Sequence, residues 1–377
     1  MNLPALFEPL PLGALSLPNR LVMAPLTRMR AAPGGIATEL MADYYGQHAS
    51  AGLIITEGTA VSPQAHGYPA SPGIYMPEQI AAWRAVTDRV HSRRGRILMQ
   101  LQHNGRDSLP AYNTDGSLPV APSAIPYVGK VYTPEFVPLD PPAPRALDAS
   151  EMPALVESFS KAAANAVAAG FDGVEIQGAN GHLIDQFLCN GSNHRTDRYG
   201  GTIAGRARFL LDVVDSTIAA IGTDRLGVRL SPYGQYGGIF DSDPIALFQY
   251  VLGELSARNI AYLHLVEARG SEIGITDELH PNAPNNAQLF RHAFSGPLIS
   301  AGAYTPESGA LAVGNGQADA IAFGRLFIAN PDLVARVRLR ASLNTPDRST
   351  FYGGASRGYT DYPTLRQQPV VEVSTHG

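Results

Sequence analysis

The sequence has little cysteine, little charge and no long hydrophobic run. Its 377 residues include one cysteine, which excludes an internal disulfide and a cysteine-rich zinc site, and we expect no metal. The opening MNLPALFEPL lacks a basic region followed by an apolar run, and no stretch reaches the roughly 18 apolar residues of a membrane span. We therefore expect a soluble protein of a reducing compartment, the cytoplasm.

The charge balance excludes several kinds of partner. Charged residues make up 16% of the chain, and 28 basic residues nearly offset 33 acidic ones, for a net charge of −5. No polybasic segment is present, so neither nucleic acid nor a membrane surface is an expected partner. The 38 glycines and 30 prolines follow no short period, which excludes collagen-like sequence and favours a fold with many tight turns.

Short apolar runs alternate with longer amphipathic segments. The predicted strands are 19–26, 53–58, 96–102, 173–178, 226–232, 262–268, 297–303 and 320–325. The predicted helices include 77–94, 149–169, 241–259, where Asp243 precedes a proline, and 305–313, which Thr305 caps. Strand–helix alternation indicates a parallel sheet, and eight such units make a (β/α)8 TIM barrel. We predict an α/β fold with one domain over 1–377.

Three further segments have expected places around this barrel. Residues 103–145, rich in proline and tyrosine, form a long capping loop after the third strand, which we interpret as a lid over the site. The N-terminal LFEPLPLGALSLPNR predicts a hairpin that closes the barrel bottom, and the tail 341–377 should run over the outside or rim.

Polar residues occur where the strand period points into the barrel. In 173–178, Glu175 and Gln177 alternate with outward-facing valine and isoleucine; Arg229 faces inward in 226–232, and Gln100 and Gln102 share a face in 96–102. Inward polar groups are costly in a packed barrel unless a ligand satisfies them. A molecule with many hydrogen-bonding edges should therefore fill the upper barrel.

Six motifs spread along the chain resemble those of the old yellow enzyme family. They are APLTRMRA (24–31), TEGTAVSPQAHGY (56–68), GANGHLIDQFL (178–188), SNHRTDRYGG (192–201), VRLSPYG (228–234) and FGRLFIANPDL (323–333), in family order. The resemblance implies a barrel that binds FMN non-covalently and uses NAD(P)H to reduce activated alkenes. It also implies a small-molecule alkene substrate and a monomer or homodimer.

The same resemblance assigns the cofactor site. Thr27 matches the hydroxyl near flavin O4, which makes it a catalytic candidate as well. Gln100 matches the ligand of the pyrimidine edge, and Arg229 the cation that stabilises the reduced flavin. Backbone contacts with the flavin are expected from Ala24, Pro25, Gly58 and Thr59. The phosphate site is expected at Gly302, Ala303, Gly324 and Arg325.

The substrate cavity is expected to contain Tyr68, Gln102, Phe351 and Tyr352. Each assignment has a plainer alternative. In these alternatives, Arg229 forms a salt bridge with a carboxylate in the barrel, and Gln100 is an interior amide with its hydrogen bonds satisfied. Thr27 is a turn residue, and Gly302 and Gly324 are ordinary glycines at strand ends. The aromatic residues Tyr68, Phe351 and Tyr352 pack in the core. We interpret Cys189 as an inert loop residue.

The substrate clamp departs from the family pattern. The family usually has His, then His or Asn three residues on, then a proton-donating Tyr two further on. Here these positions hold Gln177, Asn180 and His182, and Gln102 replaces the usual Trp. Both amides can still donate to a substrate oxygen, although they are neutral. A histidine with an ordinary pKa near 6.5 is a plausible acid, so His182 is the candidate proton donor. Its alternative is a loop histidine without a proton role, in which case the proton comes from water, Tyr68 or Tyr352.

Three functions follow from this pattern. The leading hypothesis is an NAD(P)H-dependent flavin oxidoreductase that reduces the C=C bond of α,β-unsaturated carbonyl or related alkenes. The altered clamp leaves open a flavin-dependent isomerase or dehydrogenase acting on a specialised enone. A flavin-binding protein without catalysis is the third alternative.

Overall fold

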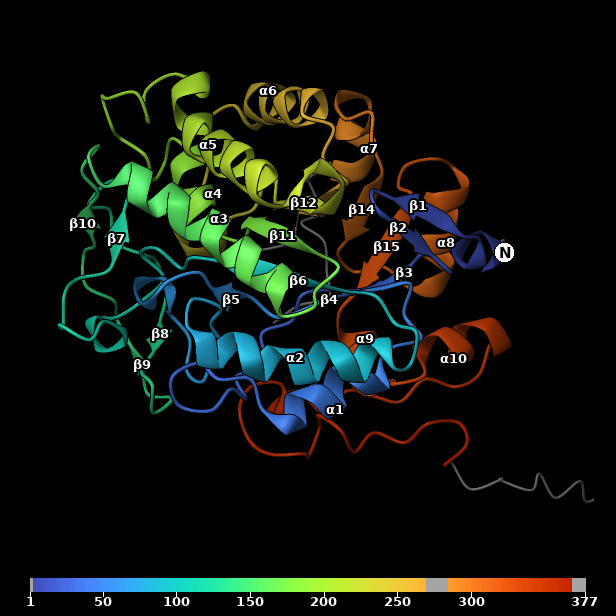
Figure 1. Ribbon diagram of the computed structural model, residues 1–377. Helices are drawn as coiled ribbons and strands as arrows, with labels where there is room; N and C mark the ends of the chain where they lie inside the picture. Colours follow the sequence, from blue (N-terminus) through green and yellow to red (C-terminus); the bar gives the residue numbers. More distant parts are fainter. Residues whose placement is uncertain (1–2, 269–283, 368–377) are drawn as a thin grey trace, which may run out of the picture.

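The computed structural model describes residues 3–268 and 284–367. Within them, eight parallel strands form a closed barrel with helices on the outside (Figure 1). The barrel strands are β3 (Leu21–Met23), β4 (Leu53–Ile55), β6 (Ile97–Gln102), β11 (Gly173–Gly178), β12 (Leu226–Leu230), β13 (Tyr262–Val266), β14 (Leu298–Ala301) and β15 (Ala320–Phe323). Strands β15 and β3 pair in parallel and close the ring, which confirms the predicted (β/α)8 barrel.

Helices connect these strands. The α-helices are α1 (Glu39–Gln47), α2 (Pro77–His91), α3 (Met152–Ala168), α4 (Leu183–Leu188), α5 (Ile203–Ile221), α6 (Pro244–Ala257), α7 (Asn286–Phe290), α8 (Pro306–Gly314), α9 (Arg325–Ala329) and α10 (Leu333–Leu339). Short 3-10 turns are η1 (Leu3–Phe7), η2 (Pro63–Ala65), η3 (Pro110–Tyr112), η4 (Thr223–Arg225), η5 (Tyr236–Gly238), η6 (Arg291–Ala293) and η7 (Arg348–Thr350). The predicted caps are present: Asp243 accepts from the N–H of Ala246, and Thr305 from that of Ser308. Among the described helices, none combines the length and apolarity needed to cross a membrane.

The side chains of the barrel strands alternate as the sequence predicted. Val174 and Ile176 of β11 pack in the large hydrophobic cluster that includes the helices. Glu175, between them, hydrogen-bonds to Gln100 of β6 and His264 of β13 inside the barrel. Because successive side chains of a strand point to opposite faces, the polar side chains of β11 point into the barrel and its apolar side chains point toward the helices.

The N-terminal hairpin closes the barrel as predicted. Strands β1 (Leu10–Leu12) and β2 (Leu15–Leu17) pair antiparallel, and their leucines pack against the apolar residues inside the barrel. Gly13, at the turn, has a φ of +56°, and a Cβ there would lie 2.1 Å from the carbonyl oxygen of Asp224. The backbone N–H of Ala14 donates to that same oxygen over 2.9 Å. Glycine is thus required where the hairpin meets the loop before β12.

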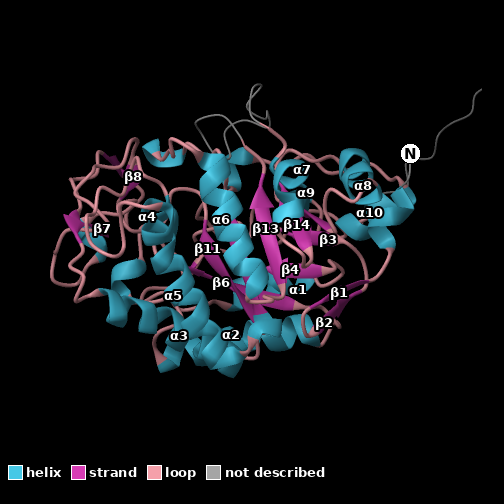
Figure 2. Cartoon of the chain, turned by 90° about the horizontal axis from the view of Figure 1, so that it is seen from above, coloured by secondary structure: helices cyan, strands magenta, loops and turns pink. Residues whose placement is uncertain are grey.

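The segment 103–145 contains more regular structure than expected. Strands β7 (Val120–Ala121) and β10 (Arg145–Ala146) pair in parallel, while β8 (Val131–Tyr132) and β9 (Pro138–Leu139) form a hairpin. Figure 2 shows β7 and β8 beside the barrel rather than over its outer helices. The buried guanidinium of Arg106 donates to the carbonyl oxygens of Ile125, Pro126 and Gly237, which ties the segment to the loop after β12.

The C-terminal tail runs over the rim, also as predicted. Arg28, in the loop after β3, donates to the carbonyl oxygens of Phe351 and Gly358. Arg336 of α10 donates to that of Pro363. The last part of the predicted tail, 368–377, lies outside the described residues.

Candidate active site

A cavity of about 1260 Å³ opens at the carboxyl ends of the barrel strands. Most residues expected at the site line it: Ala24, Pro25, Thr27, Tyr68, Gln100, Gln102, Gln177, Asn180, His182, Arg229, Gly302, Ala303, Gly324, Arg325, Phe351 and Tyr352. The segment 103–145 contributes Asp107, Tyr127, Val131, Tyr132 and Phe136. This segment therefore forms part of the cavity wall, and its role as a lid stays a prediction.

Two residues expected at the flavin do not line the cavity. A Cβ on Gly58 would lie 1.9 Å from Oε1 of Gln102, so this glycine sits directly behind the Gln102 side chain. Thr59 is fully buried, and its hydroxyl donates to the carbonyl oxygen of Glu57. Their role as flavin contacts stays a prediction.

A buried polar network forms the floor of the cavity. Oε1 of Glu175 accepts from Nε2 of Gln100 over 2.7 Å. Oε2 of Glu175 accepts from Nδ1 of His264 over 2.8 Å and from the hydroxyl of Tyr262 over 3.1 Å. Burial raises the pKa of Glu175, but His264 and the nearby Arg229 outweigh it and hold that pKa below its ordinary value. The floor therefore carries a carboxylate beside the Arg229 guanidinium.

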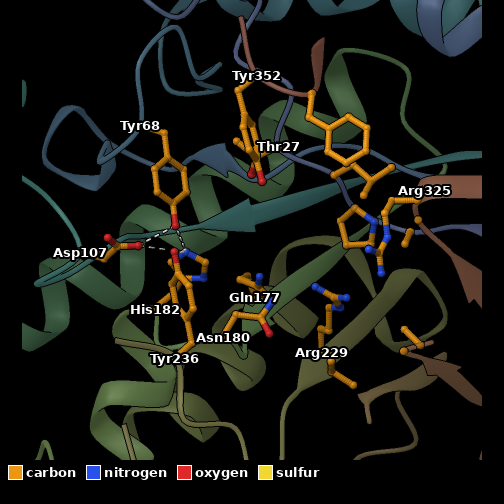
Figure 3. Close-up of a pocket in the computed structure, with 18 of the residues that line it drawn as sticks. Thr27, Tyr68, Asp107, Gln177, Asn180, His182, Arg229, Tyr236, Arg325 and Tyr352 are labelled. Carbon is orange, nitrogen blue, oxygen red and sulfur yellow. Dashed lines mark hydrogen bonds and ion pairs between the residues drawn. The ribbon is translucent and has the colours of Figure 1, made fainter. Parts of the chain in front are cut away.

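Two arginines define one side of the cavity. Arg229 is the second-to-last residue of β12, and Arg325 begins α9 after Gly324, the residue that follows β15. Figure 3 shows both on the side opposite Tyr68. Gly302, with a φ of +132°, and Ala303, with a φ of +51°, turn the chain after β14 in conformations that side chains rarely adopt. Two cations and an open backbone turn suit an anionic ligand such as a phosphate.

Two amides lie in the middle of the cavity. Gln177 lies near the end of β11, and Asn180 follows in the loop, with a φ of +59° and its backbone N–H donating to the hydroxyl of Ser231. Oε1 of Gln177 and Oδ1 of Asn180 are buried and accept no hydrogen bond from the described residues. A buried polar atom without a partner costs about 1–3 kcal/mol, so this pair is built for a ligand with polar edges.

The other side of the cavity holds an acid, a phenol and an imidazole. The hydroxyl of Tyr68 lies 2.6 Å from Oδ2 of Asp107 and 2.9 Å from Nε2 of His182 (Figure 3). Burial raises the pKa of Asp107 to about 7, although Tyr68 and Arg106 act in the opposite direction. Burial, reinforced by the charge of Arg229, lowers the pKa of His182 to about 4.

This environment corrects one expectation from the sequence. The sequence predicted an ordinary pKa near 6.5 for His182, but burial lowers that pKa to about 4, so the ring is neutral near pH 7. Asp107 was missed, although it is one of two adjacent charges, with Arg106, in a loop that otherwise has few. Tyr127 and Tyr236 were missed as well; both line the cavity beside Asp107.

The cavity residues fit FMN. The interior amide Gln100 and the cation Arg229 suit the polar edge of a flavin ring, while the open turn at Gly302 and the guanidinium of Arg325 suit its phosphate. The described residues contain no cluster of three or more histidine, cysteine or carboxylate side chains that would suggest a metal instead. Fold and site together define an FMN-dependent oxidoreductase built on a TIM barrel.

Comparison with known proteins gives the family. The sequence profile of the NADH:flavin oxidoreductase / NADH oxidase family matches residues 5–344. The chain is 44% identical to 12-oxophytodienoate reductase 7 of Oryza sativa subsp. japonica over 375 residues, which is 96% of this chain and 95% of that protein. It is 42% identical to a probable flavin mononucleotide-dependent alkene reductase of Leishmania infantum, over 97% of this chain and 98% of that protein.

A solved structure agrees with these relatives. The old yellow enzyme homologue from Zymomonas mobilis superposes with a TM-score of 0.91 and 42% identity, covering 96% of this chain and 99% of that one. This chain belongs to the NADH:flavin oxidoreductase / NADH oxidase family, the family of old yellow enzyme.

Proposed function

We propose that the enzyme oxidises a reduced nicotinamide, NADH or NADPH, and reduces the C=C bond of an α,β-unsaturated carbonyl or related activated alkene. The observation that carries this proposal is the pair of buried amides, Gln177 and Asn180, whose side-chain oxygens have no partner among the described residues. Donors of a bound ligand would remove the cost of leaving these two oxygens unsatisfied, and the amide N–H groups of the pair remain for a substrate oxygen.

The residues that would hold FMN are those of the floor and of the arginine side. Gln100 and Arg229 would bind the pyrimidine edge, and Thr27, Ala24 and Pro25 line the wall beside it. Gly302, Ala303, Gly324 and Arg325 would hold the phosphate. FMN held by these residues would supply hydride chemistry for the reduction of an activated alkene.

Gln177 and Asn180 would bind the carbonyl or nitro oxygen of the substrate. Negative charge builds on that oxygen when the β-carbon gains a hydride, and two side-chain N–H donors in a water-poor cavity stabilise it. Because amides stay neutral, their stabilisation is weaker than that of a charged donor. The aromatic residues Tyr68, Phe351 and Tyr352, with Gln102, would pack around the rest of the substrate.

The remaining features of the proposal rest on the sequence. The chain works as one domain, with 103–145 as its lid, and is a monomer or a homodimer. Its single cysteine, Cys189, is buried, as suits a protein of the reducing cytoplasm.

The test is stoichiometry with the FMN-loaded protein. A reductase consumes one NADH or NADPH for each saturated ketone formed from a simple enone such as 2-cyclohexenone. An isomerase or dehydrogenase forms product without catalytic consumption of nicotinamide, and that result would replace the proposal with the alternative the altered clamp left open.

A further inference from the structure

Tyr68, Asp107 and His182 come from three different loops at the carboxyl end of the barrel. Tyr68 follows β5 (Thr59–Ala60), Asp107 belongs to the lid after β6, and His182 directly precedes α4. The phenol oxygen of Tyr68 is the centre of the cluster, with Asp107 Oδ2 at 2.6 Å and His182 Nε2 at 2.9 Å. Asp107 and His182 are buried, whereas Tyr68 is only half-buried and faces the cavity.

The distances require one more proton than the tyrosine itself provides. Nδ1 of His182 lies 3.2 Å from the carbonyl oxygen of Ala179, which only accepts, so the proton of a neutral ring is on Nδ1. Each of the two contacts of the Tyr68 oxygen then needs a proton between its atoms, and the hydroxyl has one. The second proton lies either on the carboxyl of Asp107 or on Nε2 of His182.

These two arrangements differ only by proton shifts through Tyr68. In one, neutral Asp107 donates to Tyr68, and Tyr68 donates to His182. In the other, Tyr68 donates to the Asp107 carboxylate, and a His182 imidazolium donates to Tyr68. The surroundings favour the first, because burial penalises the charged form of both end groups.

The charged and titratable neighbours do not reverse this preference. Arg106 faces Asp107 and favours its carboxylate, but less strongly than burial opposes it. Tyr127 and Tyr236 are close to Asp107 and stay protonated, since burial raises the pKa of each phenol. On the other side, Arg229 and His103 surround His182; Arg229 disfavours its cation, and burial lowers the pKa of His103 to about 3.

We propose that Asp107 stores a proton that Tyr68 delivers to the α-carbon of the substrate, with His182 holding the Tyr68 hydroxyl in place. This inference rests on the proposed alkene reduction. The O–H bond of Tyr68 breaks as the C–H bond at the α-carbon forms with the electron pair of the substrate enolate. The Asp107 proton moves to Tyr68 in the same event. The remaining Asp107 carboxylate regains a proton from water before the next turnover. Tyr68 is the catalytic residue of this step, and Asp107 and His182 are positioning residues.

The proton on Asp107 can be detected by spectroscopy without any catalytic reaction. Infrared spectra of the oxidised, FMN-loaded protein are recorded from about pH 5 to about pH 9, and the spectrum of Asp107→Asn is subtracted from that of the wild type. We expect a protonated-carboxyl band that disappears with a midpoint near 7, the pKa that burial sets for Asp107. A difference spectrum with no such band, or a midpoint near 4, would overturn the proposal.

A matched control separates the relay from burial alone. Asp185 is also a buried carboxyl, and burial raises its pKa to about 6, but it accepts from the N–H of Gly181 and from Ser231 rather than from Tyr68. Asp185→Asn should leave the Asp107 band in place. Tyr68→Phe should keep the band and raise its midpoint, because the Tyr68 hydrogen bond lowers the pKa of Asp107. This second variant also keeps the test open if Asp107→Asn fails to fold.

Rapid kinetics test the delivery step. Reoxidation of the reduced enzyme by 2-cyclohexenone should slow by about 10²-fold or more in Tyr68→Phe, the usual effect of losing a general acid. Asp107→Asn should also slow it and remove the decline that the wild type shows above about pH 7, and the double variant should be no slower than Tyr68→Phe. Reduction by NADH should change little in all three, since that half-reaction uses no substrate proton.

The outcomes distinguish the two proposals. Additive losses in the double variant, or an unchanged pH profile in Asp107→Asn, would overturn the relay while leaving alkene reduction standing. If the wild type accepts no enone or nitroalkene, alkene reduction fails; the delivery step then falls with it, and the infrared titration alone decides whether Asp107 stores a proton.

Discussion

Gln100 of β6 and Glu175 of β11 are register partners, and Nε2 of Gln100 donates to Oε1 of Glu175 over 2.7 Å. The bond uses one of the two N–H groups of the amide and leaves its carbonyl oxygen and second N–H available to a ligand in the cavity. It also places a carboxylate on the floor near Arg229, whose charge helps to hold the pKa of Glu175 down. Glu175 and Arg229 therefore place one anion and one cation close together at the floor of the cavity.

Removing the floor anion should make the bound flavin easier to reduce. In Glu175→Gln, Arg229 loses a nearby negative charge, so it stabilises an anionic reduced ring more strongly. We expect the two-electron potential to rise by about 30 mV or more, which corresponds to about 1.4 kcal/mol. Equilibration with a reference dye measures this, and an unchanged or lower potential would contradict the assignment of the pyrimidine edge to Gln100 and Arg229.

The phosphate assignment predicts a selective loss of affinity. Arg325→Ala should weaken FMN binding more than tenfold, a loss above about 1.4 kcal/mol, because it removes a charge-assisted contact with a dianion. Riboflavin, which has no phosphate, should be affected much less. Fluorescence titration of the apoprotein with both ligands measures the difference, and equal weakening of the two would place the phosphate elsewhere.

The clamp assignment predicts an effect confined to the substrate. Gln177→Leu keeps the side-chain size roughly constant and removes both polar ends of the amide. We expect reoxidation by 2-cyclohexenone to slow by about 10²-fold, as when one donor to a developing oxyanion is lost. Stopped-flow absorbance under anaerobic conditions follows the reaction, with Leu343→Gln, an exposed position on the tail, as a surface control.

The effect of Gln177→Leu is expected only in flavin reoxidation by the substrate. Reduction of the flavin by NADH should stay within about twofold of wild type in Gln177→Leu, an allowance smaller than 1 kcal/mol. Equal slowing of both half-reactions would show that Gln177 supports the cofactor rather than the substrate.

The buried acid predicts an unusual dependence of stability on pH. The pKa of Asp107 is about 7 in the folded protein and near 3.8 when unfolded, so its contribution to stability is complete below about pH 4 and is lost as the pH rises through 7. Asp107→Asn removes that loss. Its melting temperature relative to wild type should therefore increase from about pH 5 to about pH 8.

His182 provides the control of opposite sign. Its pKa falls from 6.5 to about 4 on folding, so its contribution is present above 6.5 and is lost as the pH falls through 4. The melting temperature of His182→Gln relative to wild type should therefore increase as the pH falls below about 6.

The Asp107 prediction has a clear contrary outcome. If the melting temperatures of Asp107→Asn and wild type change in parallel with pH, Asp107 is ionised in the folded protein at pH 7.

Much of the barrel could be predicted from residue order, because strand and helix periods are local properties. The predicted strand 173–178 coincides with β11, and the inward phase of Glu175 follows from alternation alone. Strand ends were predicted too long at 19–26 and 53–58, since β3 and β4 each keep only three residues in the ladder. The polar residues that turn inward were sufficient to indicate a polar ligand.

The chemistry of the acid side was decided by tertiary structure. Tyr68, Asp107 and His182 lie 114 residues apart at the extremes, and no periodicity links three loops that follow different strands. Sequence determined that a histidine occupies position 182, near the cavity. Only the folded packing decides that its ring is buried and neutral and that a carboxyl missed in the sequence lies 2.6 Å from the same phenol, because a pKa depends on the dielectric and the neighbours that the fold brings together.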